Sequence, residues 1–185
     1  MKDREILIGV SGGIAAYKSA ALVSQLVQCG ARVTVAMTEA ATEFVGVATF
    51  AALTGRPVAT GLFDAQLFPQ GAHIALAQRA EFFCVAPASA NFLGKAAHGI
   101  ADDLLSTLYL CFAGPVLLAP AMNPDMWAKP AVQRNVAQLR TDGVLIIPPE
   151  EGWLSCRRTG PGRMADPDRI QEEIAQALAA VRRDS

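Results

Sequence analysis

Residues 5–30 read EILIGVSGGIAAYKSAALVSQLVQCG and hold a complete strand, turn and helix pattern. The first part, residues 5–10, is apolar at almost every position, which is typical of a strand buried on both faces of a parallel sheet. Small residues follow at 11–13, and an amphipathic stretch then ends at Gly30, a residue that favours a helix stop. This order predicts one strand joined to one helix by a tight turn.

The same order recurs along the rest of the chain. Further apolar runs, each predicted to form a strand, occupy residues 31–37, 81–87, 115–121 and 144–149. Helical patterns lie between and after these runs, at residues 38–55, 89–112, 123–143 and 166–183. We therefore predict a single α/β domain over residues 1–185, with a Rossmann-like (flavodoxin-like) doubly wound parallel sheet and helices on both faces. Ligands of such folds bind at the carboxyl ends of the strands.

The composition limits the classes of function. Hydrophobic residues make up 52% of the chain and charged residues 18%, a bias that fits extra burial at a subunit interface. The formal net charge of −1 provides no basic field for nucleic acid or for an anionic membrane. The four cysteines show no C-x-x-C spacing, so no metal site is predicted, and the reducing cytoplasm is the expected compartment.

Residues 104–124 carry no charge and are long enough to span a bilayer. Gly114 and Pro115 interrupt this segment, and Pro120 closes it. A buried helix followed by a buried strand is therefore predicted here, and not a membrane span.

Small or polar residues follow each of the first three predicted strands. The SGG turn at 11–13 matches neither the P-loop nor the G-x-G-x-x-G pattern, yet free N–H groups at a helix N-terminus favour an anion such as phosphate. Thr38 suits a phosphate contact or a helix cap, and Glu39 keeps open a nicotinamide dinucleotide, whose ribose needs an acid here. Ser89 and Asn91 begin another helix and suit either a cap or a ligand contact.

Candidates for acid–base and thiol chemistry are few. His73 is the better candidate for a base, because His98 sits at a predicted helix C-terminus, where the helix dipole favours it. By its residue chemistry, Asn123 is first of all a helix N-cap. Cys156 lies in a loop of about 149–166 that is rich in Gly, Pro and Arg. Nearby cations favour a thiolate, so this loop is either a lid over an anionic substrate or an ordinary surface loop.

Four motifs together resemble a known family. HIALA begins at His73, PAMNPDMW covers residues 120–127, GWLSCRRTGPGRMADP covers 152–167, and GIADDLLSTL covers 99–108. The chain is similar over nearly its whole length to the flavin-dependent cysteine decarboxylases. It is most similar to the branch that decarboxylates 4′-phospho-N-pantothenoylcysteine to 4′-phosphopantetheine in coenzyme A biosynthesis.

The resemblance implies FMN as cofactor and a phosphorylated small molecule as substrate. In this family the thiol is oxidised to a thioaldehyde, carbon dioxide leaves, and the resulting enethiolate is reduced again. The implied base is His73, the implied late proton donor is Cys156, and the implied substrate contacts are Asn123, Met122 and Arg163. The implied FMN contacts are Gly12, Gly13, Ile14, Thr38, Phe44, Ser89, Ala90, Asn91 and Ala121.

The resemblance also implies a homo-oligomer, either a trimer or a dodecamer of trimers, with sites between subunits, and a separate synthetase as partner. Two positions depart from the family pattern, since Arg157 stands where the loop usually has Gly and His98 stands where Asn is common. Three alternatives stay open. They are a peptidyl-cysteine oxidative decarboxylase, a non-catalytic flavin-binding regulatory subunit, and an oxidoreductase that uses a nicotinamide dinucleotide.

Overall fold

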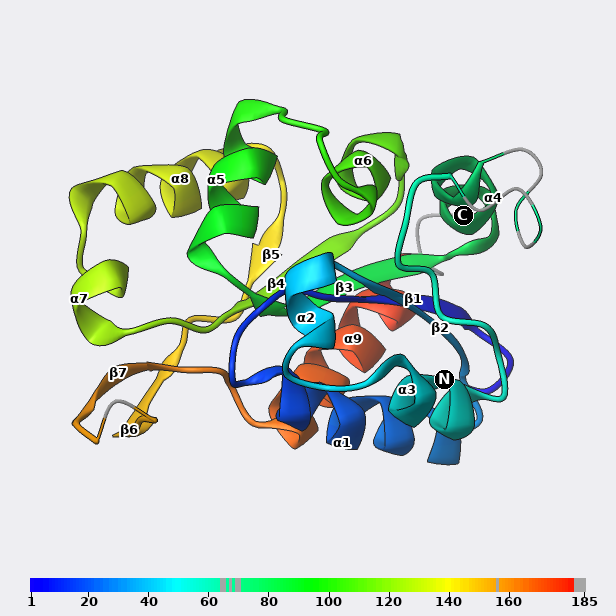
Figure 1. The fold of residues 1–185 in the computed structure, drawn as a ribbon, viewed down its shortest axis with the longest axis horizontal. Coiled ribbons are helices and arrows are strands. Elements are labelled where there is room, and N and C mark those ends of the chain that lie inside the picture. The colour runs from blue at the N-terminus through cyan, green and yellow to red at the C-terminus, as the bar shows by residue number, and fades with distance from the viewer. Residues whose placement is uncertain (64–65, 67, 69–70, 156, 182–185) are drawn as a thin grey trace.

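A computed structural model describes residues 1–185 except 64–65, 67, 69–70, 156 and 182–185. Its centre is a five-stranded parallel sheet in the order β2-β1-β3-β4-β5 (Figure 1). The strands are β1 (Glu5–Val10), β2 (Arg32–Met37), β3 (Phe82–Ala88), β4 (Val116–Pro120) and β5 (Leu145–Ile146). All five predicted strands are thus present, and this order is the flavodoxin-like one, in which the chain reverses direction across the sheet between β1 and β3.

Helices cover both faces of the sheet, as predicted (Figure 1). One face carries α1 (Ala16–Gln28), α3 (Val47–Thr54) and α9 (Pro167–Val181). The other face carries α4 (Ala72–Arg79), α5 (Ala90–His98), α6 (Leu104–Cys111) and α8 (Pro130–Thr141). Two short helices, α2 (Glu39–Thr42) and α7 (Pro124–Trp127), follow the carboxyl ends of β2 and β4.

Two apolar cores explain why the strands are apolar at successive positions. Ile6 and Ile8 of β1 pack into the core under α1, α3 and α9, whereas Leu7 between them packs into the core under α4, α5, α6 and α8. Phe82 and Phe83 of β3 divide between the two cores in the same way. Because successive side chains of a strand point to opposite faces, a sheet covered on both sides needs apolar residues at nearly every position.

Three elements differ from the sequence-based expectation. The helix predicted over 38–55 has the expected ends, at the Thr38 cap and at Gly55 in the left-handed conformation (φ 65°), but it divides into α2 and α3. Gly46 takes an extended conformation (ψ 145°) and caps α3, which separates the two pieces. A further helix, α4, was not predicted. The loop predicted near 149–166 contains an antiparallel hairpin of β6 (Glu150–Trp153) and β7 (Thr159–Arg163).

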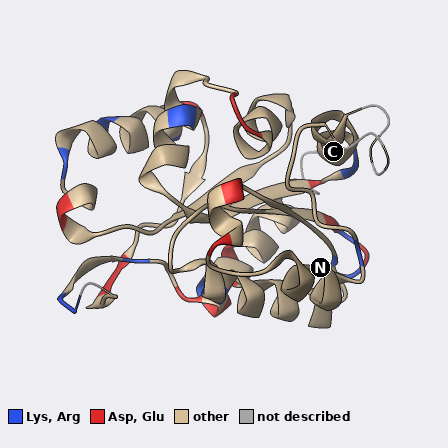
Figure 2. Cartoon of the chain, viewed as in Figure 1, with Lys and Arg blue, Asp and Glu red and all other residues tan. Residues whose placement is uncertain are grey.

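The uncharged segment 104–124 folds as predicted into a helix, α6, and a buried strand, β4. Among the described residues, none of the helices has the length and apolarity needed to cross a bilayer. Basic and acidic residues both occur along the periphery of the chain (Figure 2), in keeping with the net charge of −1.

Candidate functional site

The segments that follow β1, β3 and β4 meet at the carboxyl edge of the sheet and are joined by hydrogen bonds. The buried hydroxyl of Ser11, just after β1, donates to the Pro87 carbonyl (2.7 Å) and accepts from the Ser89 amide (2.8 Å). The Ala121 amide, just after β4, donates to the Ala88 carbonyl (3.2 Å). Ser11 thus fixes the loops of β1 and β3 together at the point where the strand order reverses, and sequence reasoning did not single it out.

Two cavities open at this edge, one on each side of the β1–α1 loop. The first, of about 520 Å³, lies between the N-terminus of α1, the segment after β4 and the β6–β7 hairpin. The second, of about 420 Å³, lies between the β1–α1 loop, α2, α5 and α7. The predicted residues lining the first cavity are Gly13, Ile14, Ala121, Met122, Asn123 and Arg163. The predicted residues lining the second cavity are Gly12, Thr38, Ser89, Ala90 and Asn91.

The N-terminus of α1 has the properties of a binding site for an anion or a polar ligand. The first-turn amides of α1 donate to the carbonyls of residues 13–15, so the N–H groups available to a ligand are those of Gly13 and Ile14 in the turn just before the helix. Gly13 has no atom within 4 Å of the position that a Cβ would take, which leaves the backbone open to close approach. A Cβ on Gly12 would come within 2.6 Å of the Ala40 Cβ, so glycine there allows α2 to pack against the turn.

Two hydroxyls show that the helix-cap and ligand-contact alternatives are compatible. Thr38 caps α2 by accepting from the Ala41 amide (3.2 Å), and Ser89 caps α5 by accepting from the Phe92 amide (3.3 Å). A hydroxyl can accept and donate at once. Each of these residues therefore keeps its O–H as a donor toward the second cavity, which both of them line.

Asn123 likewise has a structural role and lines a cavity. Its side-chain oxygen accepts from the Asp125 amide (2.8 Å) and caps α7, with Pro124 at the first helical position. The cap uses the carbonyl end of the amide and leaves the NH₂ group, with two N–H donors, for other partners. In a residue that lines the first cavity, these donors suit an anionic group such as a carboxylate.

The β6–β7 hairpin is attached to the segment that carries Asn123. The Met122 amide donates to the Gly162 carbonyl (3.0 Å), and Gly160 packs against the Pro124 ring. At the tip of the hairpin, Arg158 pairs with Asp125 (3.2 Å). Both of these side chains are exposed, so the ion pair contributes at most about 1 kcal/mol. The backbone contacts of the glycines therefore matter more for docking than the ion pair.

Replacing Gly162 by alanine should detach the hairpin. Gly162 has φ 145°, a conformation that is nearly restricted to glycine, and a Cβ there would lie 2.2 Å from the Met122 carbonyl oxygen. We expect the free energy of unfolding in a denaturant titration to fall by about 1–3 kcal/mol. Gly61→Ala is the control, because its surroundings are open and a change of less than about 0.5 kcal/mol is expected. Equal stability of the two variants would contradict this account of the docking.

A network of ion pairs connects two residues that line the first cavity, Lys18 and Arg163, to nearby carboxylates. Lys18 of α1 donates to Asp166 (2.7 Å) and to the Met164 carbonyl (3.1 Å), and Arg163 pairs with Asp166 (3.1 Å) and Glu150 (3.2 Å). The hydrogen bond from Lys18 holds the pKa of Asp166 below its ordinary value. The network ties the hairpin to α1. Lys18 was not predicted as a site residue. A cation in the first turns of the helix that follows the glycine turn could have indicated it.

Two predicted residues lie outside both cavities, and one lies outside the described residues. Phe44 follows α2 and is half exposed, and it lines neither cavity. His73, in the first turn of α4, also lines neither cavity, and its buried Nδ1 has no hydrogen-bond partner among the described residues. Figure 1 shows α4 and the β6–β7 hairpin at opposite ends of the longest axis. Cys156 is outside the described residues.

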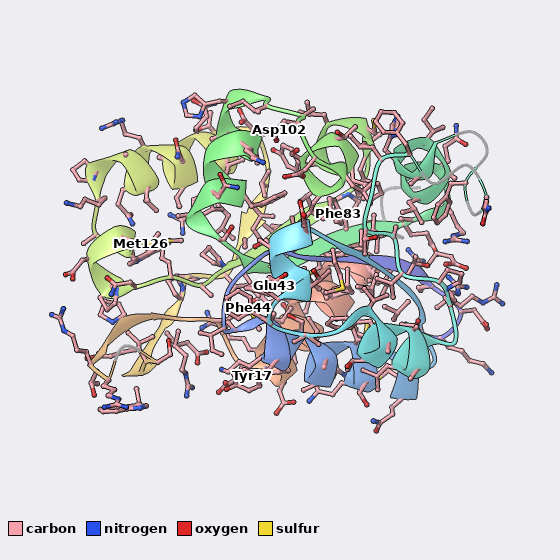
Figure 3. All side chains as sticks on the ribbon, in the orientation of Figure 1. Tyr17, Glu43, Phe44, Phe83, Asp102 and Met126 are labelled. Atoms are coloured by element: carbon pink, nitrogen blue, oxygen red, sulfur yellow. The ribbon has the colours of Figure 1, made fainter. Side chains whose placement is uncertain are left out.

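Large apolar side chains are exposed around the two cavities. Tyr17 and Trp153 line the first cavity at 60% and 67% exposure, and Met126 lines the second at 46%. Figure 3 shows Tyr17 on α1, Phe44 just after α2 and Met126 on α7. Exposed large apolar side chains beside a cavity are typical of a surface that a ligand or another protein chain covers.

Comparisons with known proteins find similar sequences and similar solved structures. A model of the family described as Flavoprotein matches residues 1–179. The coenzyme A biosynthesis bifunctional protein CoaBC of Bacillus subtilis (strain 168) is 48% identical over 170 residues, which are 92% of this chain and 42% of that protein. This chain therefore spans less than half the length of that curated relative.

Solved structures are similar over almost the whole of both chains. The FMN-dependent cysteine decarboxylase SpaF matches with a TM-score of 0.83 and 38% identity, over 96% of each chain. A PPC decarboxylase mutant complexed with pantothenoylaminoethenethiol matches with a TM-score of 0.83 and 28% identity, over 95% of this chain and 98% of that one.

Proposed function

Because this chain belongs to the Flavoprotein family, we propose that it is an FMN-dependent decarboxylase that converts 4′-phospho-N-pantothenoylcysteine to 4′-phosphopantetheine in coenzyme A biosynthesis. One observation carries the choice of reaction. Asn123 lines the first cavity with its amide oxygen used in a helix cap and its NH₂ group left as a donor. Such a donor holds a carboxylate without neutralising the negative charge that drives loss of carbon dioxide.

The choice of asparagine over arginine has a kinetic reason. An arginine would bind the substrate carboxylate more tightly, but it would stabilise the ground state as much as the transition state, which does not raise the rate. Met122 and Arg163 line the same cavity and are the other proposed substrate contacts. Lys18 lines it as well, and we add it to this set as a cation near the substrate.

The residues at the carboxyl edge fit FMN. The turn before α1 provides N–H donors at Gly13 and Ile14, and Gly12 allows α2 to pack against this turn. Thr38 and Ser89 provide hydroxyl donors in the second cavity. The other proposed contacts are Ala90, Asn91, Ala121 and Phe44. When bound, FMN would supply the oxidising and reducing equivalents for the carbon that carries the thiol.

The protein's own groups would hold the substrate and move protons. Asn123 would orient the carboxylate, and His73 would accept a proton as the thiol is oxidised. Carbon dioxide would leave once the oxidised sulfur-bearing carbon provides an electron sink. Cys156 would then donate a proton late in the reaction, which completes the saturated product. Without that proton the enethiol would be the product.

A homo-oligomer would complete this site, and a trimer or a dodecamer of trimers is the proposed form. His73 lies outside both cavities of its own chain, whereas exposed Tyr17, Trp153 and Met126 surround these cavities. A second copy that covers these apolar residues can bring its own His73 to Asn123. A synthetase activity that supplies the substrate is the proposed partner, since the relative CoaBC is described as bifunctional.

Incubation of the purified protein with 4′-phospho-N-pantothenoylcysteine, followed by mass spectrometry, tests the proposal. A product that differs from the substrate by carbon dioxide alone would support the full cycle of oxidation, decarboxylation and reduction. A yellow protein that leaves the substrate unchanged would contradict the proposal and point to a flavin-binding regulatory subunit. A colourless protein that binds NAD would point to an oxidoreductase.

A peptidyl-cysteine oxidative decarboxylase is the second candidate, favoured by the 38% identity to the cysteine decarboxylase SpaF. It differs in its product, which would lack two further hydrogens because the enethiol is not reduced. Arg157 belongs to the same question. Arg157 has φ 61°, a left-handed conformation that a glycine, the usual residue at this position of the family's loop, would adopt without strain. If the enethiol accumulates, Arg157→Gly tests whether this departure impairs the reductive half.

A further inference from the structure

Lys95 lines the second cavity but is not among the proposed contacts to FMN or to the substrate. It lies on α5, one helical turn after Asn91, so the two side chains share a face of the helix. Both line the second cavity, together with Asp103. The Lys95 side chain is only 16% exposed, and its ammonium group pairs with Asp102 (2.6 Å) and Asp103 (2.7 Å).

The acidic partners hold Lys95 in one place. Asp103 is the N-cap of α6, and its Oδ1 accepts from the Ser106 amide (2.8 Å) while its Oδ2 accepts from Lys95. Burial raises the pKa of Asp103, but the hydrogen bonds from Lys95 and Ser106 outweigh it, and the pKa lies below its ordinary value. Figure 2 shows the basic segment of α5 beside the acidic segment at the start of α6, and Figure 3 labels Asp102 there.

The ammonium group still has a donor to spare. It carries three N–H donors, and the two carboxylates account for two of them. The third N–H donor is available to a ligand, because Lys95 lines the second cavity. A ligand atom that accepts hydrogen bonds would complete the coordination of Lys95 without disturbing either ion pair.

The charges around the cavity select the kind of acceptor. Among the described residues that line the second cavity, Lys95 is the single cation, and the same lining holds the carboxylates of Glu39 and Asp103. A dianionic phosphate would be repelled by this surplus of negative charge. The first cavity suits a phosphate better, because its described lining holds Lys18 and Arg163 and no acidic residue. A neutral oxygen is therefore the acceptor that fits Lys95.

We propose that Lys95, oriented by Asp102 and Asp103, is a cofactor-binding residue that donates a hydrogen bond to a neutral oxygen of the flavin, on its ring or its ribityl chain. This inference rests on the proposed binding of FMN. It assigns the second cavity to the uncharged part of the cofactor. Lys95 thus has a role that a purely structural ion pair between α5 and α6 would not have.

The test compares two flavins on the flavin-free protein. Lys95→Met removes the donor and keeps the length of the side chain, and the dissociation constants of FMN and riboflavin are measured by quenching of flavin fluorescence. We expect both flavins to bind about 10-fold more weakly, as for the loss of a hydrogen bond from a charged group. Lys95→Arg, which retains the charge and the donors, should restore most of the affinity for both.

Matched controls separate binding from stability. Arg56→Met breaks a partly buried ion pair with Glu5 (2.6 Å) at the opposite edge of the sheet, and it should lower stability without changing flavin affinity. Asp102→Asn removes one of the two carboxylates that orient Lys95, so it should weaken the binding of both flavins, by less than Lys95→Met does because Asp103 remains. It serves as the second variant if Lys95→Met fails to fold, because unchanged affinity for both flavins in Asp102→Asn would then overturn the assignment.

The remaining outcomes of the flavin-binding test would overturn either the role of Lys95 or the proposed function. Weaker binding of FMN with unchanged binding of riboflavin would overturn the proposal, because it would place the phosphate at Lys95. Unchanged binding of both flavins would reduce Lys95 to a structural ion pair. Failure of the wild-type protein to bind either flavin would instead refute the proposed function, so the two failures are distinguishable.

Discussion

His73→Asn should abolish release of carbon dioxide while the protein keeps its flavin. A general base contributes about 10²–10⁴-fold to a rate, and an asparagine of similar size cannot accept the proton. The flavin should be retained, because His73 is not among the proposed FMN contacts and lines neither cavity of its own chain. The measurements are the rate of carbon dioxide release and the flavin absorbance of the purified variant.

His98→Asn is the matched control for this experiment. His98 is exposed at the end of α5, where its Nδ1 lies 2.8 Å from the Gly94 carbonyl, and it lines neither cavity. Turnover of this variant should stay close to that of the wild type. Normal turnover by His73→Asn would remove His73 from the proposed mechanism.

The same variant tests whether the site is shared between subunits. Asn123→Ala should also be inactive, since it lacks the proposed carboxylate donor. If His73 and Asn123 of one site come from different subunits, co-expression of the two inactive variants should restore about a quarter of the sites by random mixing. No recovery of activity in mixed oligomers would place both residues of a site in one chain.

Cys156→Ser should change the product and leave decarboxylation in place. A serine hydroxyl is a much weaker acid than a thiol, so the late proton transfer fails while the earlier loss of carbon dioxide continues. Mass spectrometry should show an enethiol product, two hydrogens lighter than phosphopantetheine. Cys111→Ser, at an exposed position on α6, is the control and should make the saturated product.

Saturated product from Cys156→Ser would end the assignment of Cys156 as the proton donor. The structure describes the residues on either side of Cys156. The Leu154 and Arg158 backbones are joined at the hairpin tip (3.0 Å), and the hairpin is docked on the segment that carries Asn123. The Gly162→Ala variant therefore offers an independent test, because detachment of the hairpin should impair this same late step.

Much of the fold was predictable because the relevant signals are local. The apolar runs at residues 5–10 and 81–87 are strands within a residue of the expected bounds, since a strand buried on both faces must be apolar throughout. The helix ends at Thr38 and Gly55 were also predictable, because capping depends on residues next to each other in the chain. The roles proposed for His73, Asn123 and Cys156 came from the family resemblance of their motifs.

The rest depended on contacts between distant segments. The glycines at 160 and 162 looked like loop residues, yet they allow a strand to lie against the Met122 carbonyl and the Pro124 ring. Lys95 looked like an ordinary helix cation until the start of α6 placed two carboxylates around it. By itself the sequence determined the five strands of the sheet, the helices between them apart from α4, and the residues available for chemistry. The tertiary structure decided which of them share a cavity and which, like His73, lie apart, because such proximity depends on the packing of segments far apart in the chain.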